Sequence, residues 1–498
     1  MEGTVSVVSG EGGAAPEGTH LRSNALGLSA LVIMGIAYMG LALTAYFNFG
    51  IMEGITGPVV PLAFAAVTIA MLPTAASYAV MSNRRPSTGS TFTWLWEATA
   101  PPIGIWLGWV LVITYIFGCI LQPVMFGLFF NSLLDYFGIG TSYWTATVLG
   151  LISIVVVAIM TKRDIRISAK VTAIFIAIEA GFVALLAIYI IIKQAIDGNL
   201  SGQPLNPGAA THGWTGFQNA LLFAVLAIAA FDIVAPMAEE TRTPRSLVPK
   251  ATILCTIGAG AYWVVTSFGL INAVPSSTMQ SYVQSGEFTP IYLVADHYIG
   301  YLRILVPLTG MTAVFAAFTA ISIAASRLLY ALAREGLAPR TFSLTDENRT
   351  PWNAQKLVLG CCIVLPVLVG LYQDRNPLLA FGWIGESYVF FVLIPYTLTC
   401  VANIVFHLRR DRASFNPIWH LVLPLLGIVI NCYIFYKNFL KTFLIDATSF
   451  KYQTSITTVC FALVLLAVVF TVIGLRRVTT SNAPRGFTET DVKAERVI

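Results

Sequence analysis

Long runs of apolar residues dominate the pattern along this chain, and short polar segments separate them. Two of the runs, 175–192 and 460–475, are apolar on nearly every face, so they lack the alternation of a barrel strand. Each crossing of a bilayer core takes about 20 apolar residues in helical form, because lipid offers no partners to backbone N–H and C=O groups. The pattern predicts an all-α polytopic membrane protein.

Twelve runs are long enough to cross, and both chain ends are polar. The runs cover residues 26–50, 56–82, 103–132, 143–161, 168–193, 214–238, 248–273, 302–333, 355–373, 378–406, 418–440 and 455–475. The third, eighth and tenth exceed a perpendicular crossing, so we expect those helices to be tilted. We expect residues 1–25 and 478–498 to form flexible cytoplasmic tails around one membrane domain at 26–475.

Two segments between the runs predict short helices that do not cross. Thr91–Trp96 is amphipathic and predicts an interfacial or re-entrant helix whose tryptophans lie near the lipid headgroups. The segment Pro275–His297 is expected to hold another short helix.

The charges indicate how the chain is oriented. Only 11% of the residues are charged and 57% are hydrophobic, which excludes a water-soluble protein of this length. Of the 29 lysines and arginines, six lie on the side opposite the termini: Lys193, Arg303, Arg375, Lys437, Lys441 and Lys451. Because basic loops stay in the cytoplasm, we expect both termini to be cytoplasmic in a cell membrane. The net charge of +5 follows from these loops and does not indicate a nucleic-acid partner.

Histidine and cysteine patterns argue against an enzyme, a metal site and a disulfide framework. All five histidines fall in loops or at helix ends, whereas an intramembrane hydrolase or acyltransferase needs such groups clustered inside the membrane. The seven cysteines lie inside apolar runs without CxxC spacing, so we expect them to be packing residues.

Three groups of motifs follow one another along the first eight runs. They are Gly57-Pro58 with Ser77-Tyr78-Ala79, RPSTGSTFTW at 85–94 and Gly108-Trp109; then AEETRTPRSLVP at 238–249; then SRLLYALAREGLAP at 326–339. In these motifs and their order the chain resembles the amino acid–polyamine–organocation superfamily of transporters. The resemblance implies a leucine-transporter-type fold with inverted repeats at 26–193 and 214–406 and two peripheral helices at 418–475. It also implies that the first and sixth helices are interrupted near the bilayer midplane.

The residues themselves are compatible with two interrupted helices. The first run holds Gly35 and Gly40, the better break points, and the sixth holds Asp232 and Pro236. A broken helix exposes N–H and C=O groups that can replace the hydration of a ligand. The resemblance places substrate against Ala37, Tyr38, Met39, Gly40, Leu41, Ala42, Ile228, Ala229 and Phe231. The Gly-Ser-Gly break typical of the family is replaced here by Gly40-Leu41-Ala42, so Leu41 narrows the approach of a carboxylate to the backbone.

Three acids are expected inside the bundle as proton-coupling or gating groups. Asp232 stands twelve residues before Pro244, the place of the acid in the family pattern. Glu179 lies about 14 Å into the fifth run at 1.5 Å per residue, and Glu386 lies in the tenth. A carboxylate in mid-membrane is costly unless it is protonated or paired. Structural hydrogen bonds, an internal salt bridge and a water-filled vestibule are the alternatives.

Hydroxyls and basic residues of the eighth run supply two further candidates. Thr319 and Ser322 form a candidate ion site with Glu179. Arg327 and Arg334 face the acidic pair at 239–240 in the motifs above, and they either form an inner gate of ion pairs or anchor the chain on the positive side of the membrane.

Together these features predict a secondary transporter that moves an amino acid or organic amine by alternating access. We expect proton symport, because carboxylates titrate, and a proton or sodium gradient in place of a cofactor. The alternatives are a polyamine or amine exchanger, a Na⁺-coupled carrier, and a transporter-derived amino acid sensor or channel. The expected partners are a small-molecule substrate and membrane lipid, and the oligomeric state is left open.

Overall fold

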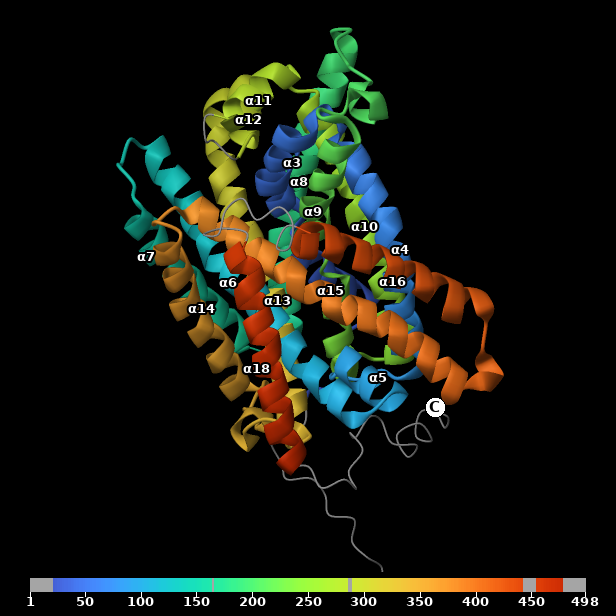
Figure 1. Cartoon of the computed structure of the whole chain (residues 1–498). Helices are drawn as coiled ribbons and strands as arrows, with labels where there is room; N and C mark the ends of the chain where they lie inside the picture. Colours follow the sequence, from blue (N-terminus) through green and yellow to red (C-terminus); the bar gives the residue numbers. More distant parts are fainter. Residues whose placement is uncertain (1–20, 164, 285–288, 442–453, 478–498) are drawn as a thin grey trace, which may run out of the picture.

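Figure 1 shows a computed structural model of the chain, which describes residues 21–163, 165–284, 289–441 and 454–477. Within these residues the chain is helical throughout, and its β structure is limited to one isolated bridge between Leu26 and Thr241. The predicted tails at 1–25 and 478–498 lie outside the described residues except for 21–25.

The first half of the chain contains the following elements. They are α1 (Leu28–Met39), α2 (Leu41–Leu43), η1 (Thr44–Asn48), α3 (Phe49–Thr56), η2 (Gly57–Val59), α4 (Val60–Arg84), α5 (Thr91–Ala98), α6 (Pro101–Tyr136), α7 (Tyr143–Thr161), α8 (Ile165–Ile196), η3 (Gln203–Leu205) and η4 (Pro207–Ala209).

The second half begins with a helix that breaks at its centre. Its elements are α9 (Gly213–Ile228), η5 (Phe231–Glu240), α10 (Pro244–Ile271), α11 (Ser276–Gln284), α12 (Ile291–Ile299), η6 (Gly300–Ile304), α13 (Leu305–Arg334), η7 (Arg340–Ser343), α14 (Trp352–Tyr372), α15 (Pro377–Arg409), η8 (Arg412–Ser414), η9 (Ile418–Val422), α16 (Leu423–Phe435), η10 (Tyr436–Leu440) and α18 (Ser455–Arg477).

The described residues contain eleven helical stretches that are long and apolar enough to cross a membrane. The first of them, Leu28–Arg84, has 57 residues and crosses twice. Its two ends return to the same end of the bundle, because the Arg242 N–H donates to Leu26 O at 3.0 Å and the Asn83 amide donates to Arg245 O at 2.8 Å. The described residues therefore contain twelve crossings, the number that the hydrophobic runs predict.

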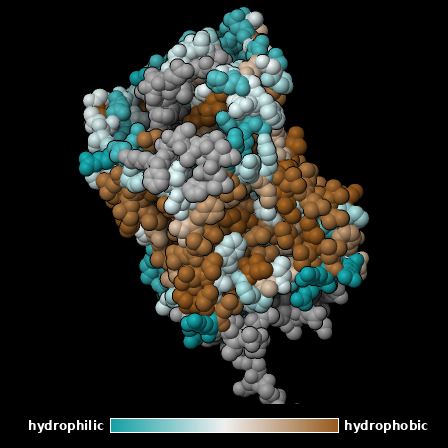
Figure 2. All heavy atoms as spheres, viewed as in Figure 1, coloured by the Kyte–Doolittle hydropathy of each residue, from teal (hydrophilic) through white to brown (hydrophobic). Residues whose placement is uncertain are grey.

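The interrupted crossings α1–α3 and α9–η5 lie at the centre of the bundle. α1 contacts α10, α8, α13 and η5, and α6 packs between α13 and α15. α7 and α14 contact each other at the left edge of Figure 1, and α16 packs on α4 and α15 at the right. Figure 2 shows apolar residues gathered in a band around the middle, with hydrophilic residues toward both ends. This distribution is that of a protein immersed in lipid.

Both short helices predicted between the runs are present. α5 forms over Thr91–Ala98, and the segment 275–297 holds α11 and the start of α12. Trp94 is fully buried within the protein and does not face lipid, and the expected depth of the α5 tryptophans near the headgroups stays a prediction. Its indole N–H donates to Arg85 O at 2.6 Å and its ring meets Tyr78 edge-on, so protein groups satisfy both the polar and the apolar part of the side chain.

Candidate functional site

Two crossings are interrupted near their centres, as the sequence predicts. Gly40 separates α1 from α2 with φ 62° and ψ 66°, a left-handed conformation that glycine adopts without a steric penalty. Between α9 and η5, Ala229 and Ala230 leave helical geometry with ψ angles of 73° and 0°. Below this break the chain continues as a ten-residue 3₁₀ helix.

The other break candidates have packing roles. Gly35 stays inside α1, where an added Cβ would lie 2.6 Å from Cys255 Sγ on α10. Its missing side chain allows the two helices to approach closely. Pro236 lies inside η5 rather than at the break. The interruption in the first crossing is therefore at Gly40.

The break at Gly40 frees backbone groups at mid-bundle. The first hydrogen bond of the new helix runs from the Thr44 N–H to Gly40 O at 2.9 Å. The N–H groups of Leu41, Ala42 and Leu43 precede it, so they have no acceptor within the helix. At the other break, the Ala229 carbonyl accepts a hydrogen bond from the Tyr388 hydroxyl. Donors at one break and carbonyls at the other suit a ligand with an anionic and a cationic end.

A pocket of about 460 Å³ borders both breaks. Its walls come from the first crossing, α6, α9 and α15. The lining residues are Tyr38, Met39, Gly40, Leu43, Thr44, Asn48, Leu121, Gln122, Met125, Leu226, Ala227, Ala229, Ala230, Phe381 and Tyr388. No aspartate, glutamate, lysine, arginine or histidine of the described chain is among them.

Four of the nine residues expected to bind substrate line this pocket: Tyr38, Met39, Gly40 and Ala229. The other five are buried in the segments beside the breaks and do not line it: Ala37, Leu41, Ala42, Ile228 and Phe231.

The walls contributed by α6 and α15 were not predicted as substrate contacts. Gln122 on α6 is the informative one, because its Nε2 donates to Gly118 O at 3.2 Å while its Oε1 is buried without a hydrogen-bond partner. In the sequence, the signal for this pocket residue is an amide side chain inside an apolar run. Leu121, Met125 and Phe381 gave none, since apolar residues that line a pocket look like those that pack.

Asp232 lies just below the second break, held by two tyrosines. Its Oδ2 accepts from the Tyr115 hydroxyl of α6 at 2.8 Å and its Oδ1 from the Tyr396 hydroxyl of α15 at 2.9 Å. The ring of Phe231 stacks on Tyr396 with centroids 4.7 Å apart. The acid is buried and does not line the pocket, and its two hydrogen bonds link η5 to α6 and α15.

Glu179 on α8 is fully buried, and neither carboxylate oxygen has a hydrogen-bond partner. A charged carboxylate without a partner is costly in this setting, so the site favours a neutral acid or a bound cation.

The hydroxyls proposed to share an ion with Glu179 are engaged elsewhere. Thr319 Oγ1 donates to Met160 Sδ at 3.7 Å and Ser322 Oγ donates to Thr319 O at 3.2 Å. Both are buried on α13.

Glu386 is half-buried on α15 and does not line the pocket. It shares a helix face with Trp383, whose indole donates to Ser455 Oγ at 2.9 Å, and with Phe390, which packs on Phe461. Tyr388, which does line the pocket, is on another face of the helix. The structure thus places Glu386 toward the peripheral helices, and its gating role stays a prediction.

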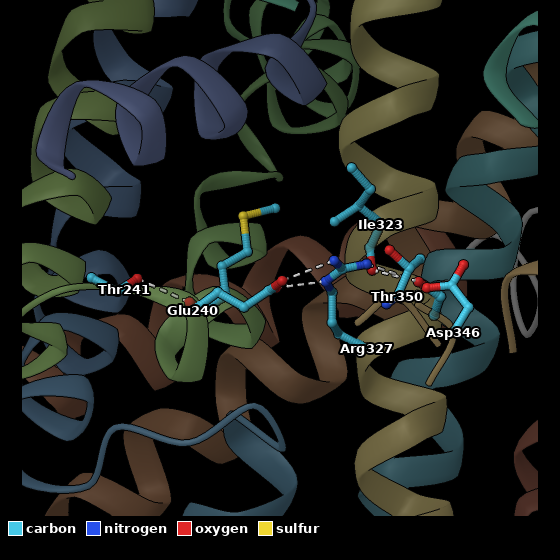
Figure 3. A network of polar contacts seen from close by, with 8 residues as sticks. Glu240, Thr241, Ile323, Arg327, Asp346 and Thr350 are labelled. Atoms are coloured by element: carbon cyan, nitrogen blue, oxygen red, sulfur yellow. Dashed lines mark hydrogen bonds and ion pairs between the residues drawn. The ribbon is translucent and has the colours of Figure 1, made fainter. Parts of the chain in front are cut away.

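Two ion pairs close the end of the bundle below Asp232. Arg327 on α13 donates from Nε to Glu240 Oε2 at 2.7 Å and from Nη2 to Oε1 at 3.0 Å, with both side chains 2% exposed or less. Arg334 makes the same two-pronged contact with Glu239 at 2.8 and 2.7 Å, at a more exposed position. In Figure 3 the Arg327 guanidinium points at the Glu240 carboxylate, with Asp346 and Thr350 on its other side.

Glu240 also holds the start of the first crossing. Its carbonyl accepts the N–H groups of Ala25 and Leu26 at 2.8 and 2.9 Å. One residue of η5 therefore ties α13 to the beginning of α1.

The model of the amino acid permease family matches residues 24–483 of the chain. The chain belongs to this family. The permease is 24% identical over 415 residues to the low-affinity putrescine importer PlaP of Escherichia coli, covering 81% of this chain and 86% of that protein. It is 21% identical over 380 residues to the branched-chain amino acid permease BcaP of Lactococcus lactis, covering 73% of this chain and 78% of that protein.

A solved structure shares the fold of the permease. A single-residue mutant of the Eremococcus coleocola manganese transporter superposes with a TM-score of 0.57 at 12% identity, covering 91% of this chain and 94% of that one. The superposition and the two interrupted crossings confirm the leucine-transporter-type fold. The family membership also confirms that the permease is a multi-pass membrane transporter for amino acids or amines and not an enzyme.

The close approach of α6 to Tyr38 yields a test of the pocket. An added Cβ at Gly118 would lie 2.1 Å from the Tyr38 hydroxyl, so Gly118→Ala pushes that side chain into the pocket. Overpacking of this kind costs about 1–3 kcal/mol, and we expect KM to rise by about tenfold. The check is the initial rate of uptake into liposomes against substrate concentration. Gly181→Ala, where nothing lies within 4 Å of the added Cβ, is the control and leaves KM unchanged.

Proposed function

We propose that this permease carries a zwitterionic amino acid across the cytoplasmic membrane by alternating access, driven by proton symport. The observation that supports it best is the pocket between two interrupted helices, in a bundle that a buried ion pair holds together at one end. In the proposed cycle, the Glu240–Arg327 contact separates when the pocket opens to the other side. The positive-inside distribution of lysine and arginine supports an arrangement with both termini in the cytoplasm.

The backbone at the two breaks suits the two ends of an amino acid. The free N–H groups that follow Gly40, of which that of Leu43 belongs to a pocket-lining residue, would receive the carboxylate, as helix N-termini receive anions. The ammonium would lie near the unpartnered Gln122 Oε1 and the carbonyls at the second break.

The pocket walls favour an apolar side chain on the substrate. Leu121, Met125, Leu226 and Phe381 line it, while the acids of the bundle do not. A diamine would need a second anionic or carbonyl-rich contact, whereas an aliphatic side chain fits these walls without an unpaired polar group. We therefore propose an aliphatic amino acid as substrate and treat an organic amine as the alternative.

Glu179 is the residue that we propose as the proton-coupling group, with Asp232 as the second acid. Its unpartnered carboxyl is buried beside the first break, where α8 contacts α1 and α2. Protonation of Glu179 removes the cost of a buried charge. Proton binding at this carboxyl is therefore coupled to the packing of the first crossing against α8.

The experiment is uptake into liposomes holding the purified permease, with imposed pH or Na⁺ gradients and labelled leucine, valine, lysine or putrescine. We expect leucine or valine uptake to follow the pH gradient. Glu179→Gln should lower gradient-driven accumulation by about 5–150-fold, the usual range of coupling between two ligands, and spare exchange without a gradient. Glu347→Gln, a change of an exposed loop acid, is the control.

Other outcomes separate the alternatives. Accumulation that follows Na⁺ and not pH points to the Thr319 and Ser322 site in place of proton coupling. Preferred uptake of putrescine overturns the aliphatic substrate but not the carrier. Ligand binding without movement of any label would make the protein a sensor.

A further inference from the structure

A groove on the membrane-facing side of the bundle is separate from the substrate pocket. α4, α10 and the start of the η9–α16 helix border it near the right edge of Figure 1. The space between these elements, counted with its open mouth, is about 1300 Å³. The lining residues are Ala76, Ala79, Val80, Asn83, Arg84, Pro249, Lys250, Ile253, Leu254, Trp419 and His420.

The groove is polar at its mouth and apolar above it. Arg84 is the last residue of α4, and Lys250 lies in the second turn of α10. Ala76, eight residues before Arg84, lies about 12 Å farther up at 1.5 Å per residue. The small alanines of α4 form the floor, and Leu254 and Trp419, which are 49% and 50% exposed, form the rims.

The basic groups at the mouth are available to a ligand. Lys250 makes no ion pair with any residue that the structure describes. Arg84 has one partner, Asp411, at 3.5 Å. The Ser414 hydroxyl donates to Asp411 and is the main cause that holds the pKa of that acid below its usual value, and the Arg84 charge adds to this. The acid therefore stays charged, and the mouth keeps two cations against one anion.

His420 adds a neutral donor. Its Nδ1 accepts the Asn416 N–H at 2.8 Å, which leaves the ring proton on Nε2. The ring is stacked on His407 at 3.6 Å between centroids, so its orientation is held from both sides.

We propose that this groove binds one anionic phospholipid of the surrounding leaflet, with its phosphate between Arg84 and Lys250. One acyl chain would lie along the alanine floor of α4, against Ile253 and Leu254. Charge complementarity at the mouth selects an anionic headgroup, and basic side chains at this depth attract anionic lipid. The Trp419 ring would lie beside the glycerol region, a common position for membrane tryptophans.

The test uses the full-length permease in nanodiscs of phosphatidylglycerol or phosphatidylcholine, followed by native mass spectrometry of retained lipid. We expect wild type to retain one phosphatidylglycerol, and Arg84→Gln with Lys250→Gln to weaken that retention by on the order of tenfold. The control is Lys170→Gln with Lys356→Gln, which removes two exposed basic groups elsewhere. Lys250→Gln alone covers the case in which the double variant does not fold.

Equal losses of retained lipid in the test and control variants would overturn the proposed site. Such a result would mean that the basic surface as a whole attracts anionic lipid. Unchanged retention in Lys250→Gln and in the double variant would overturn it too. Ala79→Trp fills the floor and should lower retention while both charges remain. Inorganic phosphate added in detergent should leave thermal unfolding unchanged, and stabilisation by it would replace the lipid with a free anion.

Discussion

Arg327→Met is expected to destabilise the permease by about 3–5 kcal/mol, because it leaves the Glu240 carboxylate buried and unpaired. Both partners are 2% exposed or less, so water cannot replace the lost guanidinium. The measurement is unfolding in mixed micelles as denaturing detergent is added. Arg334→Met is the matched control, since its pair with Glu239 is 27% and 20% exposed and should contribute only about 0–1 kcal/mol.

The same substitution should also loosen the end of the bundle where Glu240 ties α13 to the beginning of α1. Cys255 Sγ contacts Val32 O at 3.5 Å, and this cysteine is buried on α10 against α1. In a variant whose only cysteine is Cys255, Arg327→Met is expected to speed alkylation by a water-soluble thiol reagent. The double variant Arg327→Met, Glu240→Met removes the unpaired charge and should recover stability. If the single and double variants unfold alike, the ion pair does not hold the closed state.

Asp232→Ala is expected to have the second large effect, a loss of transport of about tenfold or more. It leaves the hydroxyls of Tyr115 and Tyr396 buried without an acceptor, and each such group costs about 1–3 kcal/mol. Both unfolding and gradient-driven uptake should be measured.

Replacing both tyrosines by phenylalanine distinguishes a structural role of Asp232 from a role in coupling. In Asp232→Ala with Tyr115→Phe and Tyr396→Phe, no buried hydroxyl lacks a partner, so stability should return. If coupled uptake returns as well, Asp232 has a structural role only. If exchange without a gradient returns and accumulation does not, the acid takes part in coupling.

The sequence by itself determined the crossings and the family. Lipid imposes the same condition on each run separately, so twelve crossings follow from composition and length without knowledge of the packing. The motifs are local as well, and they place Asp232 within the sixth crossing and single out Arg327, Arg334 and the acids at 239–240 as candidates for ion pairs. The sequence also limits the break in the first crossing to Gly35 or Gly40, because both are glycines inside an apolar helix.

Only the tertiary structure decided which residues meet. Gly40 is the break because Gly35 is needed where α1 touches Cys255, and that contact joins residues far apart in sequence. The walls formed by Leu121, Met125 and Phe381 have no signature, because in a membrane protein apolar residues occur on every face. The burial of Trp94 and the direction in which Glu386 points likewise depend on which helix packs beside each residue. The hydropathy pattern along the sequence does not specify which helices are neighbours.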